Sequence, residues 1–191
     1  TERTVDWSNM LNLIHLTGME KSLKNQYQDA SNISARINLH SLYSQNPQGW
    51  FPWIYEQLDL KSNMKVLELG CGDGELWKEN KEKLPKQIEL HLTDISEGML
   101  RDTRRAIHAN VKTSRFDFQV FDCERIPYPD NSFDLVIANH ILFYCKNLTS
   151  VFEEISRVLK TGGTFVCSTY GADHMKEINE LVSEFDDRIV L

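Results

Sequence analysis

Short apolar runs alternate with helical repeats after residue 60, and this alternation constrains the fold more than any other feature of the sequence. The runs with strand composition cover residues 65–69, 88–93, 116–120, 133–138 and 164–170. The clearest helical repeat falls over 148–159, where apolar residues recur three and four positions apart. Shorter repeats predict a helix from near Gly74 to before Pro85, and another that Ser96 caps and that runs through Ile107. Strands that alternate with helices predict a doubly wound α/β fold, with a mostly parallel sheet, helices on both faces and ligands at the carboxyl ends of the strands.

Residues 1–60 differ in composition from the rest of the chain. They have mixed helical patterns rich in Asn, Gln and Ser, and a last predicted helix near 50–58 lies between a turn at 47–49 and a loop at 61–63. No flexible linker follows this helix. We therefore predict an N-terminal helical extension or lid over 1–60 and a ligand-binding core over 61–191.

Charge and composition exclude several classes of protein. The chain carries 21 Lys and Arg against 28 Asp and Glu, a net charge of −7, and this field repels phosphate backbones and disfavours a nucleic-acid partner. The apolar stretches fall far short of the ~20 residues of a membrane helix, and the N-terminus has no apolar signal region, so we expect no membrane partner. The cysteines Cys71, Cys123, Cys145 and Cys167 include no CxxC pair. We expect them to be packing residues of a reduced, cytoplasmic protein and predict no metal site.

The first predicted strand runs into a glycine loop and then a helix over residues 66–76. Gly70 and Gly72 lack the Cβ atoms that would keep a ligand away from the main chain, and the helix after them would offer free N–H groups to an anionic group. The loop is therefore expected to cradle a nucleotide or a carboxylate. Glu75 stands where a dinucleotide fingerprint has its third glycine, and no GK[ST] sequence follows, so dinucleotide and Walker-type sites are disfavoured.

Carboxylates follow the next two predicted strands. Asp94 stands at the carboxyl end of the second strand, 20 residues past Gly74, where it can accept hydrogen bonds from both hydroxyls of a ribose. Asp122 stands just past the third strand and can accept from an exocyclic amine while a backbone N–H reads a ring nitrogen. The ends of three strands then converge on one adenosine. A strand-end cap or ion pair is the alternative role for each of these carboxylates and for Glu68.

Four motifs occur in one order along the chain: the loop ELGCGDG, the Asp of strand two, the stretch DCERIPYPDNSFDLVIANHILFY and the later EISRVLKTGGTF. Together they resemble the motifs of class I S-adenosylmethionine-dependent methyltransferases, over about residues 50–170. The segments NPQGWFPWIYEQL and YGADHMKEINEL are similar to a bacterial group of small-molecule-type methyltransferases. The resemblance implies a Rossmann-like core, S-adenosyl-L-methionine as cofactor and methyl transfer to a small-molecule acceptor.

The resemblance also implies which residues contact the cofactor. They are Glu68, Gly70, Cys71, Gly72, Asp94, Ile95, Met99, Asp122, Cys123, Asn139 and Tyr144. The glycine loop would line the methionine part, with Glu68 orienting its amine directly or through water. Asp94 would hold the ribose beside Ile95 and Met99, and the segment 122–123 would read the adenine.

Residues after the fourth strand would face the reacting centre. The resemblance implies that the Asn139 carbonyl flanks the sulfonium, and Phe143 and Tyr144 place aromatic faces where they could meet a cationic methyl donor. His140 is the only histidine expected at the carboxyl edge of the sheet. It is the candidate catalytic residue, as a general base, and shaping of the pocket is its alternative role.

The expected reaction is an in-line displacement, in which holding the nucleophile and the methyl group in line and excluding water contribute most. A base is needed only for a carbon or alcohol acceptor. Residues 20–45 and the tail after Gly171 are the expected pocket walls.

Two other classes of function stay open. One is a nucleic-acid or protein methyltransferase, which is disfavoured by the acidic charge and by Asn139 to Leu142 in place of an NPPY-like box. The other is a non-catalytic module that only binds the cofactor.

The sheet of the resembling family has seven strands and ends in an antiparallel pair, whereas we count five before Leu191. A fifth strand without a neighbour would leave an open edge. We therefore expect either that C-terminal strands are missing because the sequence is a piece of a longer protein, or that a partner, such as a second copy in a homo-oligomer, supplies the edge.

Overall fold

The computed structural model describes residue 42 and residues 44–111, 115–171 and 176. Its centre is one five-stranded sheet in which every neighbouring pair of strands is parallel. The strands are β1 (Lys65–Leu69), β2 (Glu89–Asp94), β3 (Arg115–Val120), β4 (Phe133–Asn139) and β5 (Leu159–Ser168). Their order is β3-β2-β1-β4-β5, so β2 and β3 follow one another on one side of β1, and the chain then crosses to the other side, where β4 and β5 lie. The reversal lies between β1 and β4, where a doubly wound sheet binds its ligands.

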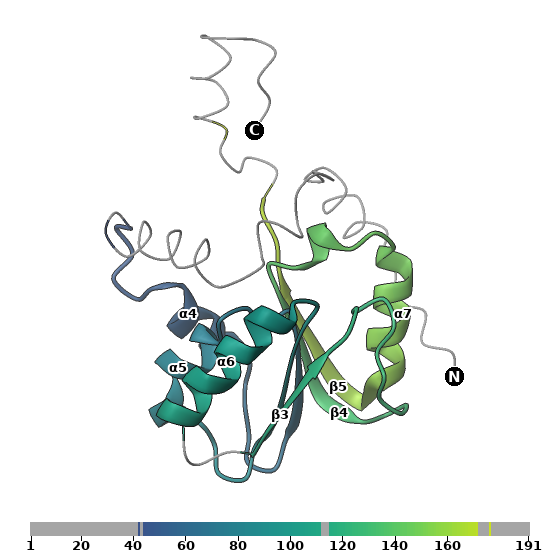
Figure 1. The fold of residues 1–191 in the computed structure, drawn as a ribbon, viewed down its shortest axis with the longest axis horizontal. Coiled ribbons are helices and arrows are strands. Elements are labelled where there is room, and N and C mark those ends of the chain that lie inside the picture. Colours follow the sequence, from purple (N-terminus) through teal and green to yellow (C-terminus); the bar gives the residue numbers. More distant parts are fainter. Residues whose placement is uncertain (1–41, 43, 112–114, 172–175, 177–191) are drawn as a thin grey trace.

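Helices cover both faces of this sheet, as the alternation of the sequence predicts. They are α4 (Trp50–Gln57), α5 (Glu75–Glu79), α6 (Glu97–Asn110) and α7 (Leu148–Val158), with short 3-10 turns η1 (Lys81–Lys83) and η2 (Leu142–Tyr144). Figure 1 shows α4, α5 and α6 on one side of the sheet and α7 on the other. The predicted doubly wound fold is confirmed over the described residues.

The sheet separates two apolar cores because successive side chains of a strand point to opposite faces. On the α5 and α6 side, Val66 and Leu90 pack with Trp77, which is fully buried. On the α7 side, Leu67 and Val136 pack in the core cluster that also contains the buried apolar stripe of that helix. These alternating positions are why β1 is almost wholly buried and its end is held rigidly.

Capping residues fix where the two long helices begin. The Ser96 side chain accepts a hydrogen bond from the Met99 N–H at the start of α6, as predicted, and the Asn147 side chain accepts one from the Ser150 N–H at the start of α7. Near the end of α7 the guanidinium of Arg157 donates to backbone carbonyls of the long β3–β4 connection, at 2.7–2.8 Å. The connection that precedes β4 is therefore tied to α7.

Two boundaries differ from the sequence prediction. The strand expected over 164–170 begins at Leu159, directly after α7, because Leu159 pairs with Phe133 before a register shift lets the rest of β5 follow β4. The helix expected to reach Pro85 ends at Glu79 and continues only as the η1 turn.

Other expectations lie outside the described residues. These are the extension before α4 with its lid over 20–45, apart from residues 42 and 44–49, and the tail after Gly171, apart from residue 176. Among the residues that are described, none of the helices combines the length and apolar character needed to cross a bilayer.

Candidate functional site

The backbone of the glycine loop after β1 disfavours residues that carry a side chain. Gly70, Gly72 and Gly74 have φ values of +68°, +55° and +78°, in the left-handed region that favours glycine. A Cβ at Gly70 would collide with the Ile141 side chain, and one at Gly74 would lie 2.8 Å from Cγ2 of Thr103. The loop is therefore packed tightly between the segment after β4 and helix α6.

Hydrogen bonds fasten this loop to the end of β2. The Asp94 carboxylate accepts from the N–H of Gly72 at 3.2 Å and from the N–H of Ser96 at 2.8 Å. The Cys71 N–H donates to the Thr93 carbonyl at 2.8 Å, and the Thr93 hydroxyl donates to the Glu68 carbonyl at 2.7 Å. The loop and Asp94, both predicted to bind the cofactor, are thus in direct contact.

These bonds change the expected chemistry of the loop. The sequence suggested free N–H groups for an anion, but Gly72 donates to Asp94, Gly74 to the Cys71 carbonyl and Glu75 to the side chain of Asp73. The loop amides are used inside the protein because acidic side chains lie beside them. The expectation of an anion cradle at these amides is corrected.

Buried carboxyl groups dominate the electrostatics of the loop. The Glu68 side chain is buried and accepts a hydrogen bond from the Trp77 indole N–H at 2.5 Å. Burial, opposed by that bond and helped by the nearby charges of Asp94 and Asp73, raises the pKa of Glu68 to about 8. Burial also raises the pKa of Asp73 and of Asp94 above the ordinary aspartate value. A nearby positive charge would stabilise the ionised form of each of these three carboxyls. The group therefore favours a ligand with positive charge and hydroxyl donors.

The residues beside Asp94 have contrasting exposure. Ile95 is 71% exposed, which is unusual for a large apolar side chain and leaves an apolar surface next to the carboxylate. Met99 is only 1% exposed, so its side chain belongs to the core under α6. Asp122 is exposed, and its side chain accepts from the Glu124 N–H in a tight turn after β3.

The segment after β4 carries the remaining predicted residues. The Asn139 side chain accepts from the Ser168 hydroxyl at 2.5 Å, so its orientation is fixed by β5. Cys123 from the loop after β3 meets Cys145 after η2, with 3.3 Å between their sulfur atoms. Tyr144 packs edge-on against Phe143, with 4.3 Å between ring centroids.

His140 stands at the centre of a group of aromatic rings at this edge. Its φ of +56° is uncommon for a residue other than glycine, and its N–H lies near the carbonyl and hydroxyl of Ser168. The imidazole contacts the rings of Trp50 and Tyr170, with 4.9 Å between ring centroids in each pair. We call Trp50, Trp53, His140, Phe143, Tyr144 and Tyr170 the aromatic cluster. It joins α4 to the ends of β4 and β5.

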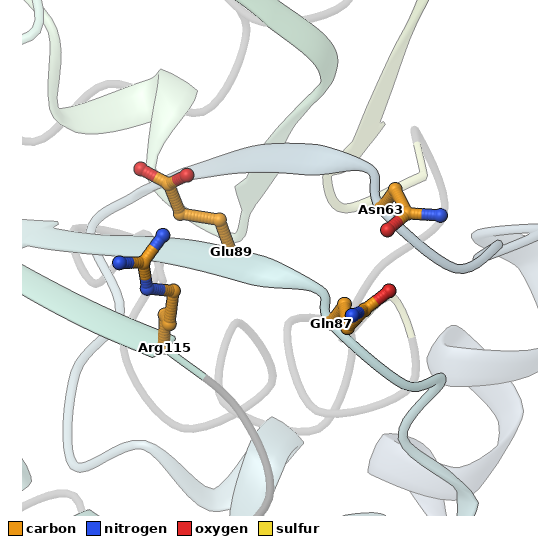
Figure 2. A pocket seen from close by; sticks show the side chains of 4 residues that line it. All are labelled: Asn63, Gln87, Glu89 and Arg115. Carbon is orange, nitrogen blue, oxygen red and sulfur yellow. The ribbon is translucent and has the colours of Figure 1, made fainter.

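A cavity of about 510 Å³ lies at the opposite edge of the sheet. Its lining residues are Asn63, Gln87, Glu89 and Arg115, which stand at or just before the amino ends of β1, β2 and β3. Figure 2 shows Arg115 and Glu89 on one side of this cavity and Asn63 and Gln87 on the other. None of the predicted site residues lines it.

Three residues of the site had no signal in the sequence. Thr103 of α6 donates a hydrogen bond to the Gly72 carbonyl, Ile141 fills the space above Gly70, and Trp50 of α4 stacks on His140. All three contacts join segments far apart in the chain, and no spacing rule could have identified them.

Comparison with known proteins identifies a family whose profile matches this chain. A profile of a family described as "Methyltransferase domain" matches residues 67–167. A ubiquinone/menaquinone biosynthesis C-methyltransferase from Cupriavidus metallidurans is 36% identical over 118 residues, 60% of this chain and 46% of that protein. A malonyl-[acyl-carrier protein] O-methyltransferase from Nitrosospira multiformis is 32% identical over 135 residues, 64% of this chain and 44% of that protein. The chain spans less than half the length of either relative.

Solved structures share the fold. Phosphoethanolamine N-methyltransferase 2 of Haemonchus contortus, solved with S-adenosyl-L-methionine, aligns with a TM-score of 0.63 at 19% identity, over 90% of this chain and 44% of that chain. A SAM-dependent methyltransferase of Aquifex aeolicus aligns with a TM-score of 0.57 at 17% identity, over 83% of this chain and 88% of that chain. At such identities the likeness concerns the arrangement of strands and helices.

Proposed function

Because the chain belongs to the methyltransferase domain family, we propose that it binds S-adenosyl-L-methionine at the carboxyl edge of its sheet and transfers the methyl group to a small-molecule acceptor. The observation that carries the proposal is the acidic glycine loop. Its backbone is left-handed at Gly70 and Gly72, and the buried carboxyl of Glu68 and the partly buried carboxyl of Asp94 border it.

The chemistry of these groups fits the cofactor. When bound, S-adenosyl-L-methionine supplies an electrophilic methyl group on a sulfonium, together with an ammonium group and two ribose hydroxyls. Glu68 would hold the ammonium, and the lone pairs of Asp94 that Gly72 and Ser96 leave unused would accept from the ribose. Exposed Ile95 would cover one face of the adenine. The turn at 122–123 would present a backbone N–H to the adenine ring.

The protein contributes to such a transfer mainly by position. The positive charge is dispersed as the methyl group moves, so fixed geometry and exclusion of water matter more than a strong base, and they are worth up to ~7 to 11 kcal/mol in favourable cases. The rings of Trp50 and Tyr170 restrain His140. We propose that it shapes the acceptor pocket and that it acts as a base only where the acceptor must lose a proton.

The aromatic cluster supports an acceptor with an apolar or aromatic body. Trp50 and Trp53 are each about 40% exposed, so part of this apolar surface is open to a ligand. Several relatives are named for ubiquinone and menaquinone biosynthesis, for sterols or for malonyl-[acyl-carrier protein]. The net charge of −7 disfavours the alternative of a nucleic-acid substrate.

Calorimetry with S-adenosyl-L-methionine tests the cofactor site, and Asp94→Asn is the informative variant. It keeps one of the two oxygens that accept from the N–H groups of Gly72 and Ser96 and loses the other together with the charge, so the affinity should fall about tenfold or more. Asp134→Asn is the matched control, because Asp134 also bonds a backbone N–H of the sheet but lies at its amino edge. Equal affinity of the wild type and Asp94→Asn would contradict the proposal.

Transfer of labelled methyl groups into a metabolite extract tests catalysis. Incorporation that depends on the protein and falls in Asp94→Asn is expected. Cofactor binding without any transfer would identify the chain as a binding module instead.

A further inference from the structure

Two cysteines that are 22 positions apart come into contact at the carboxyl edge of the sheet. Cys123 lies in the loop after β3 and Cys145 lies directly after η2, and their sulfur atoms are 3.3 Å apart. Both residues are partly exposed, so a small reagent can reach the pair. The other two cysteines have no sulfur neighbour of this kind: Cys71 is buried under the glycine loop, and Cys167 belongs to β5.

Neighbouring hydrogen bonds hold the two segments together. The Glu124 carboxylate accepts from the N–H of Lys146 at 2.8 Å and from the N–H of Asn147 at 2.9 Å. The residues that follow both cysteines are therefore bonded to each other. These bonds keep the two backbone segments close together, and the rotamers of the two cysteines then set the distance between the sulfur atoms.

We propose that Cys123 and Cys145 are a modification site that forms a reversible disulfide with a small-molecule disulfide such as glutathione disulfide. The sulfurs need to close from 3.3 Å to about 2.05 Å, a change within reach of side-chain rotation. The bond would cross-link the loops after β3 and β4. That these loops border a cofactor rests on the proposed function, whereas the geometry of the thiols does not.

The exchange takes place in two balanced steps. The Cys145 thiolate attacks one sulfur of glutathione disulfide, forms a mixed disulfide and releases one glutathione thiolate. The Cys123 thiolate then attacks the Cys145 sulfur and releases the second. The two cysteines lose two protons and two electrons, and the oxidant is reduced to two thiols.

The environment of each thiol sets this order and the selectivity. The neighbouring Cys145 sulfur and burial raise the pKa of Cys123, so Cys123 keeps its proton while Cys145 stands beside it. Burial raises the pKa of Cys71 well above the ordinary thiol value and also raises the pKa of Cys167. These two thiols are expected to stay reduced.

The test treats the full chain with glutathione disulfide and measures intact mass, free thiols under denaturing conditions and a non-reducing peptide map. We expect the loss of two hydrogen atoms, two remaining free thiols of the four, and one cross-linked peptide pair containing Cys123 and Cys145. The urea midpoint should rise because the cross-link restricts the unfolded chain, and dithiothreitol should restore all four thiols.

Single variants separate the steps. Cys123→Ser should accumulate a glutathione adduct on Cys145 and Cys145→Ser one on Cys123, because in each variant the thiol that resolves the adduct is missing. Cys167→Ser is the control and should form the same cross-link as the wild type. Alanine variants replace any serine variant that does not fold. Four free thiols after treatment, a link to Cys71 or Cys167, or adducts without a cross-link in the wild type would overturn the proposal, whether or not the chain transfers methyl groups.

Discussion

Glu68→Gln is expected to change how the stability of the fold depends on pH. Glu68 is buried at the end of β1 with its carboxyl bonded to the Trp77 indole, and burial raises its pKa from 4.5 to about 8. Between these two values the folded protein holds a proton that the unfolded chain releases. Stability therefore falls as the pH rises through this window, and the loss is complete above the folded pKa.

The magnitude follows from the two pKa values. Each pH unit between 4.5 and about 8 costs up to ~1.4 kcal/mol, so the full loss is at most about 5 kcal/mol. That is a large part of the ~5 to 15 kcal/mol that stabilise a typical domain. Glutamine keeps an oxygen that can accept from Trp77 and cannot ionise, so the variant should lack this part of the slope.

Urea denaturation of the wild type and of Glu68→Gln at about pH 5, 6.5 and 8 measures the effect. The free energy of unfolding of the variant should increase steadily relative to that of the wild type as the pH rises. Glu89→Gln is the control, because the hydrogen bond with His91, opposed by burial, lowers the pKa of Glu89 from 4.5. The stability that this supplies is lost only below that value, so the difference between this variant and the wild type should stay constant over the tested range. Parallel curves for the wild type and Glu68→Gln would refute the reasoning.

Three other substitutions test the packing around the site by the same denaturation assay. Gly74→Ala places a Cβ 2.8 Å from Thr103 at a φ of +78°, so we expect the free energy of unfolding to fall by about 2 to 4 kcal/mol. The control Gly162→Ala has a φ of +82° and open space around it, so it should lose only about 1 kcal/mol. Equal losses would show that the contact with Thr103 is unimportant. Ser96→Ala removes the cap of α6 and should cost about 1 kcal/mol, which Ser96→Asp should recover. Arg157→Met removes the donors to the β3–β4 connection and should cost about 2 kcal/mol, and an unchanged midpoint would mean that this clamp contributes nothing.

The sequence was sufficient to predict the parts of the fold that depend on local periodicity. The strand at 65–69 coincides with β1 because the apolar run of strand composition stops at the glycines that follow it, and β1 is buried from its second residue to its end. The contact of Asp94 with the glycine loop was also predictable, since parallel neighbours end at one edge of a sheet. Four ordered motifs led to the methyltransferase family, and the match over residues 67–167 confirms that prediction.

Contacts between distant segments could not be predicted in this way. The start of β5 at Leu159 depends on its pairing with Phe133, and the position of His140 depends on the rings of Trp50 and Tyr170. The roles predicted for the individual cofactor residues stay predictions, because they concern a ligand and not the fold.

Stability and ligand affinity should respond to pH in opposite directions at this site. Burial raises the pKa of Glu68, Asp73 and Asp94 because each carboxylate loses water, and nearby carboxylates add to the rise at Glu68 and Asp73, so the fold weakens as the three groups ionise. The same ionisation creates the negative charge that a sulfonium and an ammonium group would neutralise. A cationic ligand should therefore bind more tightly as the pH rises toward 8. It should also raise the free energy of unfolding most at the pH values at which the protein without ligand is least stable. A site selected only for packing would have used an apolar residue in place of Glu68, so the cost of the buried carboxyl is itself an argument for a positively charged ligand.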